Sequence, residues 1–112
     1  MLRHLPACDA RVIAQPEVRA HWLADIAGPV SSTAARASVQ DIGLEARPWG
    51  FDLDEIKCPV HVWHGDADDT VPFANGVYQA NAIPGATLHE VRGEGHWLIF
   101  EHFAEILDNL HA

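Results

Sequence analysis

The sequence predicts an α/β fold with a parallel sheet, and three observations lead to this prediction. Two short runs, VHVWH at 60–64 and TLHEV at 87–91, have the β-branched composition of strands. Each run leads into a polar loop, and each loop leads into a segment of helical character. Strands that alternate with helices lie parallel in one sheet and are joined by right-handed crossovers. Residues 48–112 therefore have the predicted order strand, loop, helix, strand, loop, helix.

Two helices are predicted in this region. The first covers 73–82, begins after Pro72 and is followed by a turn at Pro84 and Gly85. The second covers 103–110, where apolar residues recur at i, i+3, i+4 and i+7, the pattern of an amphipathic helix. In the first helix the side chains expected to be buried are Val77, Tyr78 and Ala82. Core packing is expected of the preceding run Trp97, Leu98, Ile99 and Phe100.

The first 47 residues are rich in alanine and predict helices with breaks between them. Pro16 is suited to the first turn of a helix, which Gly28 and Pro29 would end. The apolar face of this helix is predicted to hold Val18, Trp22, Leu23 and Ile26. A second helix would extend to about Gly43, capped by Ser31, Ser32 or Thr33. Its few large apolar residues, Val39, Ile42 and Leu44, make a thin core, so this part is expected to pack on something else.

The number of predicted strands is too small for an independent parallel sheet. Parallel sheets are covered on both faces and usually have several strands. Residues 48–112 are therefore predicted to form one end of a larger α/β sheet.

Composition excludes several classes of function. Seven Lys and Arg against sixteen Asp and Glu give a net charge of −9 among 112 residues. This acidity argues against binding to nucleic acid or to an anionic membrane surface. The longest apolar run has four residues, too few for a transmembrane helix, and the first residues lack the apolar stretch of a secretory signal. Cys8 and Cys58 form no CxxC pair and are expected to be reduced thiols in a cytoplasmic protein.

The residues best suited to chemistry lie in the two loops that follow the predicted strands. GDADDTVP follows the first strand and RGEGHW follows the second. Functional groups gather at the carboxyl ends of strands in open α/β sheets, so the loops meet if the strands are neighbours. An Asp can then accept the Nδ1 proton of His96, fix its tautomer and stabilise the imidazolium during proton transfer. Gly93 and Gly95 would let the loop turn tightly and present His96.

Residues 48–107 resemble the C-terminal end of an α/β-hydrolase-fold protein. The matching elements are an I-x-x-P-V entry to a strand, a G-x-x-D-x-x-x-P loop, a P-G-A turn and a G-x-G-H loop, in that order. The resemblance implies that Asp68 is the acid and His96 the base of a Ser-Asp-His triad, in the family's chain order. It further implies that residues 1–47 are a helical lid, or cap, before the C-terminal end of the sheet at 48–112.

The sequence departs from this family at the nucleophile. Ser31, Ser32 and Ser38 do not lie in a G-x-S-x-G elbow, and neither do the two cysteines. The expectation is a fragment, or a truncated product that folds with its missing N-terminal half or associates with itself. In its complete form the protein would be a serine-type hydrolase of small-molecule carboxylic esters or similar acyl bonds, with no cofactor implied. The alternative is a non-catalytic remnant or an interaction module.

Three aspartates compete for the partnership with His96. Asp66 lies at the lip of the strand and is expected to turn toward backbone or solvent, whereas Asp69 lies nearer the helix start, where the dipole favours a carboxylate. Asp68 lies mid-loop with room to reach the neighbouring loop, so an Asp68 oxygen is expected within about 2.6 to 3.2 Å of His96 Nδ1. The simpler reading of Asp68 is a residue that caps the helix beginning near Pro72, or that holds its own loop by Asx-turn bonds.

A metal site is the weaker alternative at the first strand. The stretch HVWHGDAD contains the potential ligands His61, His64, Asp66 and Asp68. His61 and His64 are an odd number of residues apart, so on a strand they point to opposite faces, and no metal is expected. His64 is instead expected to pack or hydrogen-bond near the Asp68 loop. Trp97 is expected to pack in the core, and the alternative is that it lines the substrate pocket. Trp22 and Trp49 are also expected in the core, and the alternative for both is that they line a lid pocket.

Overall fold

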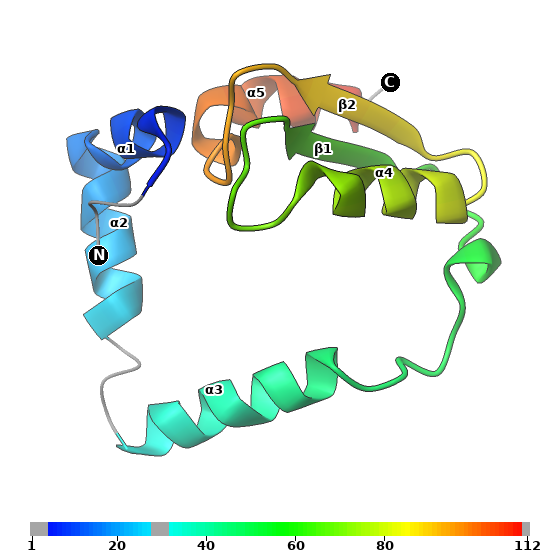
Figure 1. Cartoon of the computed structure of the whole chain (residues 1–112), viewed down its shortest axis with the longest axis horizontal. Coiled ribbons are helices and arrows are strands. Elements are labelled where there is room, and N and C mark those ends of the chain that lie inside the picture. The colour runs from blue at the N-terminus through cyan, green and yellow to red at the C-terminus, as the bar shows by residue number, and fades with distance from the viewer. Residues whose placement is uncertain (1–4, 28–31, 111–112) are drawn as a thin grey trace.

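The computed structural model describes residues 5–27 and 32–110, which form helices and a two-stranded parallel sheet (Figure 1). The expected capping residue Ser31 and the expected break at Gly28 and Pro29 lie outside the described residues. The elements are α1 (Ala7–Ile13), α2 (Pro16–Ala27), α3 (Ser32–Glu45), the short 3-10 helix η3 (Leu53–Glu55), β1 (His61–Gly65), α4 (Phe73–Ala82), β2 (Thr87–Val91) and α5 (Ile99–Asn109).

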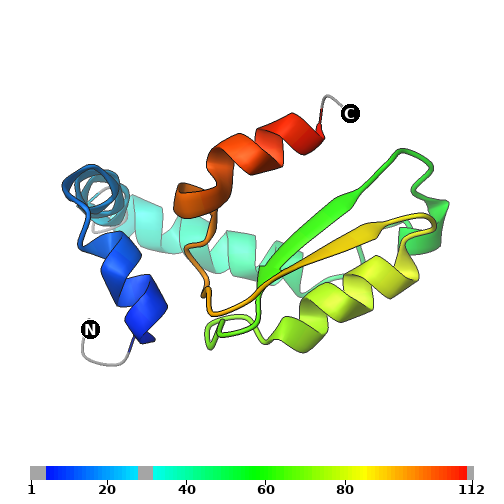
Figure 2. The same cartoon turned by 90° about the horizontal axis from the view of Figure 1, so that it is seen from above.

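The sheet pairs β1 with β2 in parallel, from His61 opposite Thr87 to Gly65 opposite Val91. α4 makes the crossover between the strands and packs on one face of the sheet, and α5 lies on the other side (Figure 2). The predicted α/β character is thus confirmed. The bounds of α4 and β2 agree with the predicted ones, and β1 is displaced by one residue from the predicted strand.

The helical reading of the N-terminal part is confirmed, with α2 beginning at Pro16 as expected. α1 is a separate helix that sequence periodicity did not mark, and it packs against α2. Three of the buried apolar side chains belong to this pair of helices: Val12, Ile13 and Val18. Elsewhere Ile83, at the end of α4, and Leu98, in the loop before α5, are buried.

Several predictions of burial were wrong. Tyr78 is 67% exposed, because the side of α4 that meets β1 is formed around Gly76 and Tyr78 points away from it. α5 begins four residues earlier than predicted, and Ile99 and Phe100 in its first turn are exposed rather than core. Along α2, Leu23 is exposed while Val18 is buried.

The apolar stripes of the outer helices are also largely uncovered. In α5 the exposed side chains also include Phe103 and Leu107, followed by Leu110 just after the helix, and in α3 they are Val39, Ile42 and Leu44. A sheet of two strands is too narrow to cover these helices. Their periodicity therefore marks apolar faces that the described residues leave exposed. In the described residues no helix is long and apolar enough to cross a membrane.

The tight approach of Gly65 to the second loop gives a test of the fold. A Cβ added at Gly65 would collide with backbone atoms of Glu94 and Gly95, whereas one added at Gly43 in α3 meets nothing within 4 Å. We expect Gly65→Ala to lower the free energy of unfolding by about 1–3 kcal/mol. Gly43→Ala should raise it by roughly 0.5–1 kcal/mol, because alanine favours the helix. Urea denaturation measures both, and an unchanged midpoint for Gly65→Ala would contradict the packing at the strand end.

The open helix faces predict self-association of the isolated chain. Exposed apolar side chains on α5 and an unpaired sheet edge favour contact between copies, and the charge of −9 opposes it only in part. Sedimentation velocity should show species larger than a monomer, and Phe103→Glu together with Leu107→Glu should shift the chain toward the monomer. A cooperatively melting monomer at all concentrations is the contrary result.

Candidate active site

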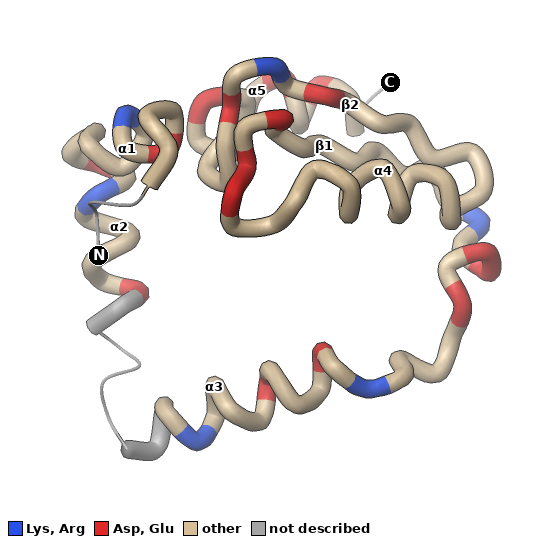
Figure 3. Tube along the Cα trace, viewed as in Figure 1, with Lys and Arg blue, Asp and Glu red and all other residues tan. Residues whose placement is uncertain are grey.

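The loops after β1 and β2 leave the same edge of the sheet and are tied together by their backbones. The N–H of Asp66 donates to the carbonyl of Val91 at 3.2 Å, and the N–H of Ala67 donates to the carbonyl of Glu94 at 3.0 Å. The Asp66 carboxylate in turn accepts the N–H of Gly93 at 2.6 Å. Gly93 has a φ of 75°, a conformation that favours glycine. The two loops therefore form one unit, and acidic residues run along its first strand-to-helix connection (Figure 3).

Asp68 uses its two carboxylate oxygens for different purposes. Oδ1 accepts the backbone N–H groups of Thr70 at 2.9 Å and of Val71 at 2.8 Å, which holds the loop as an Asx turn. Oδ2 lies 3.1 Å from His96 Nδ1 in the neighbouring loop and 3.5 Å from His64 Nε2. The side chain of Asp68 is only 5% exposed. The loop-holding reading and the His-partner reading of Asp68 are thus both met, by different atoms.

Burial and hydrogen bonding act in opposite directions on the pKa of Asp68. Removal from water is the largest single effect and raises this pKa, but the Val71 N–H, the His96 ring and the Thr70 N–H together outweigh it by stabilising the carboxylate. The net result is a pKa below the ordinary value of 3.8. Asp68 is therefore ionised at neutral pH and only accepts hydrogen bonds, so the shared proton lies on His96 Nδ1.

His96 is held on one side and open on the other. Its Nδ1 faces Asp68, its ring meets Trp97 edge-on at 5.9 Å between centroids, and its side chain is 39% exposed. With the proton on Nδ1, Nε2 carries the lone pair, and the residues within 5–27 and 32–110 give Nε2 no hydrogen bond. An imidazole in this state is ready to accept a proton at Nε2.

The predicted choice among the three aspartates agrees with this geometry. The distance from Asp68 Oδ2 to His96 Nδ1 falls within the expected range. Asp66 turns to a backbone group, the N–H of Gly93, and Asp69 is exposed in the loop. The pairing of Asp68 with His96 is confirmed as a contact, and its catalytic role stays a prediction.

His64 lies beside the site and packs as expected. Its Nε2 is 2.9 Å from the carbonyl of Val71, and its ring meets Phe73 edge-on. A Cβ at Gly76 would lie 2.6 Å from His64 Nδ1, so a glycine in α4 makes room for this imidazole. His64 thereby joins the loop of Asp68 to the helix that follows it.

His61 points to the other face of the sheet. Its Nδ1 lies 2.8 Å from His89 Nε2, and the His89 ring stacks on Trp63 with 4.2 Å between centroids. In the described part of the chain no group of three or more His, Cys, Asp or Glu side chains is arranged to hold a metal ion. Cys8 and Cys58 are both free thiols.

A cavity of about 450 Å³ adjoins the Asp68–His96 pair. Its lining is mostly apolar, and consists of His61, Trp63, His64, Asp68, Val71, His96, Leu98, Ile99 and Ile106. Trp97 is not part of this lining, since it stacks on Phe100 at 5.9 Å between centroids. An apolar group of moderate size would fit beside the imidazole.

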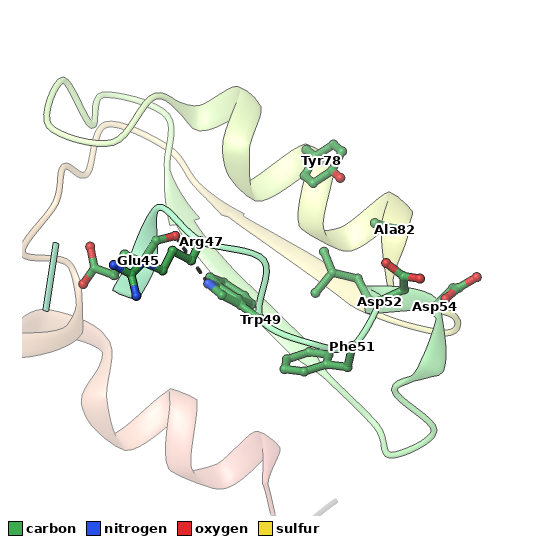
Figure 4. A pocket seen from close by; sticks show the side chains of 9 residues that line it. Glu45, Arg47, Trp49, Phe51, Asp52, Asp54, Tyr78 and Ala82 are labelled. Carbon is green, nitrogen blue, oxygen red and sulfur yellow. Dashed lines mark hydrogen bonds between the residues drawn. The ribbon is translucent and has the colours of Figure 1, made fainter. Parts of the chain in front are cut away.

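A second pocket, of about 410 Å³, lies between the segment after α3 and the outer side of α4 (Figure 4). Trp49 and Phe51 lie with their ring centroids 6.0 Å apart, and Tyr78 projects from α4. Trp49 lines this pocket and is 60% exposed, so its expected place in a core was wrong. No imidazole lines this pocket, in contrast to the cavity beside His96.

Sequence reasoning missed the residues of α1 that touch the His96 loop. Asp9 is wholly buried and its Oδ1 accepts the N–H of Trp97 at 3.0 Å. Arg11 forms an ion pair with Glu94 at 2.7 Å. An aspartate and an arginine in a short N-terminal helix give no local signal of these contacts.

No family model matches the chain, and no curated protein matches it either.

The lowered pKa of Asp68 predicts how stability depends on pH. A carboxylate whose folded pKa is depressed stabilises the fold above its ordinary pKa, and this contribution disappears as the pH falls through the lowered value. At pH 7 we expect Asp68→Asn to cost about 1–2 kcal/mol of unfolding free energy. The difference from the parent chain should shrink as the pH is lowered below 3.8.

The control for this prediction is Asp69→Asn, because Asp69 is the exposed neighbour in the same loop. Urea unfolding at a series of pH values compares the two variants with the parent chain. A deficit for Asp68→Asn that is the same at all pH values would contradict the ion pair.

Proposed function

We propose that this chain supplies the acid and the base of a serine-type hydrolase of the α/β-hydrolase fold, acting on carboxylic esters or similar acyl bonds. The observation that carries the proposal is the hydrogen bond between Asp68 Oδ2 and His96 Nδ1 at 3.1 Å, at the carboxyl ends of two parallel strands. The proposed substrate is a small molecule, and the scheme needs no cofactor.

In the proposed mechanism Asp68 orients His96 and stabilises the imidazolium. The Nε2 atom of His96 takes the proton of a serine hydroxyl as that oxygen attacks the ester carbonyl. The imidazolium then gives this proton to the leaving alcohol, and an acyl-serine remains. Water attacks the acyl-serine with His96 as general base again, which releases the carboxylic acid and restores the serine.

The proposal places the serine outside these 112 residues. The serines of this chain do not lie in a G-x-S-x-G elbow. Ser38 belongs to α3, and Figure 1 shows α3 on the opposite side of the molecule from the sheet. The elbow and the oxyanion donors would come from the remaining strands of the sheet, with 48–112 as its C-terminal end and 1–47 as a lid.

Two further observations are in keeping with the proposal. The cavity beside His96 has an apolar lining in which the acyl part of an ester would be held by Trp63, Leu98 and Ile106. The free thiols of Cys8 and Cys58 suit a reducing compartment, and we propose the cytoplasm.

The second candidate is a non-catalytic remnant or an interaction module. The exposed apolar faces of α3 and α5 favour it, since such faces mark contact with other surfaces. The two candidates differ in one respect, which is whether a serine ever reaches His96 Nε2.

The isolated chain should have no hydrolase activity, because it lacks the elbow and its oxyanion donors. We expect turnover of p-nitrophenyl esters at background and no labelling by a fluorophosphonate probe. Stoichiometric labelling of a serine among these 112 residues would contradict the proposed division of the triad.

The complete site can be tested by expressing this chain together with the coding sequence upstream of it. A serine in a G-x-S-x-G segment should be labelled by the fluorophosphonate only in the assembled protein. Asp68→Asn and His96→Ala should then each lower kcat by about 10³–10⁴-fold. Asp69→Asn is the matched control and should retain activity, and an active Asp68→Asn variant would refute the proposed role.

A further inference from the structure

Asp9 stands out among the described residues because it is a carboxylate with no exposed surface. It lies in α1, and its Oδ1 accepts the backbone N–H of Trp97, a residue 88 positions away, at 3.0 Å. Its second oxygen, Oδ2, is buried without a hydrogen-bond partner. Burying a carboxylate in this way is costly, and an apolar side chain would fill the same space at lower cost. Packing alone therefore does not account for Asp9.

The same carboxylate also touches the residue on the other side of His96. A Cβ added at Gly95 would lie 2.5 Å from Asp9 Cγ and 2.5 Å from Asp9 Oδ2. Only a glycine at this position lets the carboxylate come so close. Asp9 thus contacts both neighbours of His96, through the space left at Gly95 and through the N–H of Trp97.

Two further contacts tie α1 and the residues just after it to the same segment. Arg11 of α1 donates to Glu94 at 2.7 Å, and Gln15, between α1 and α2, donates to Glu101 in the first turn of α5. These contacts therefore reach residues before His96 and residues after it. Among them, only those of Asp9 act on the residues adjacent to the imidazole, and Asp9 is buried whereas Arg11 and Gln15 are exposed.

We propose that Asp9 is a positioning residue for His96. By accepting the Trp97 N–H and filling the space at Gly95, it fixes the backbone on both sides of His96 and so directs Nδ1 at Asp68 Oδ2. Asp9 does not touch the imidazole, and its effect passes through the backbone of 95–97. The importance of this effect for catalysis rests on the proposed function, whereas the positioning itself concerns only the Asp68–His96 pair.

Two substitutions separate the hydrogen bond from the packing. Asp9→Asn keeps an oxygen acceptor for the Trp97 N–H, and Asp9→Leu keeps a side chain of similar size without an acceptor. If Asp9 acts as proposed, the Asn variant resembles the parent chain and the Leu variant does not. If Asp9 only packs, the Leu variant resembles the parent chain. Asp25→Ala, at an exposed position of α2, is the control for loss of an aspartate from the helical part.

The measurement is NMR of the isolated chain with ¹⁵N-labelled histidine and tryptophan. The His96 Nδ1–H resonance is visible while Asp68 accepts this proton, and the Trp97 backbone N–H is protected while Asp9 accepts it. We expect both signals in the parent chain, in Asp9→Asn and in Asp25→Ala. In Asp9→Leu the Trp97 N–H should exchange at least about tenfold faster, and the His96 Nδ1–H signal should be lost.

The proposal is overturned by a folded Asp9→Leu variant that keeps the His96 signal, or by a folded Asp9→Asn variant that loses it. Protection of the β1 amides shows whether each variant is folded. Should Asp9→Leu not fold, Gly95→Ala replaces it, because the added methyl displaces the Asp9 carboxylate; retention of the His96 signal there also overturns the proposal. None of these readouts uses hydrolysis, so the failure of the proposed function and the failure of this inference are separate results.

Discussion

The parallel pairing of β1 with β2 is the constraint on which the site depends. Because Gly65 lies opposite Val91, the two strands end at the same level and the loops that follow them begin side by side. Gly65 then allows the Glu94 carbonyl to pack against the strand end, where any side chain would collide with it. The backbone bonds of Asp66 and Ala67 to the second loop follow from this approach. A substitution that separated the strand ends would separate Asp68 from His96 as well.

Within this frame the proposed chemistry depends on how the carboxylate of Asp68 divides its hydrogen bonds. Oδ1 of Asp68 is occupied by the N–H groups of Thr70 and Val71, which fixes the direction of Oδ2. His64 bonds the Val71 carbonyl, so the ring of His96 is the nearest side-chain donor to Oδ2. The same hydrogen bonds that keep Asp68 ionised therefore also direct its Oδ2 toward His96. A carboxylate held in this manner sets the tautomer of His96 without moving when the imidazole becomes charged.

The parts of the fold that were predictable are those with a local cause. The bounds of α4 and β2 follow from Pro72, from the turn at Pro84 and from β-branched residues, all of which act within a few positions. The Asp68–His96 contact was predictable because strand order and the rule for parallel sheets bring the two loops together. The contact between Asp9 and Trp97 was not, since no periodicity links residues 88 positions apart. Burial failed for a related reason: the pattern of α5 marks an apolar face, but it cannot say whether anything covers that face.

The contrast between the site and its surroundings limits what the isolated chain can do. The loops are held by contacts that lie wholly among described residues: the strand ends, the Asx turn and the bonds from α1. The faces of α3 and α5, by comparison, are left uncovered. The orientation of His96 therefore needs no further strands. A general base can be preorganised in such a unit before any nucleophile is near it. Because Nε2 of His96 has no hydrogen-bond partner in the described structure, the position that the serine hydroxyl of the proposed mechanism would have to reach is defined by the chain itself.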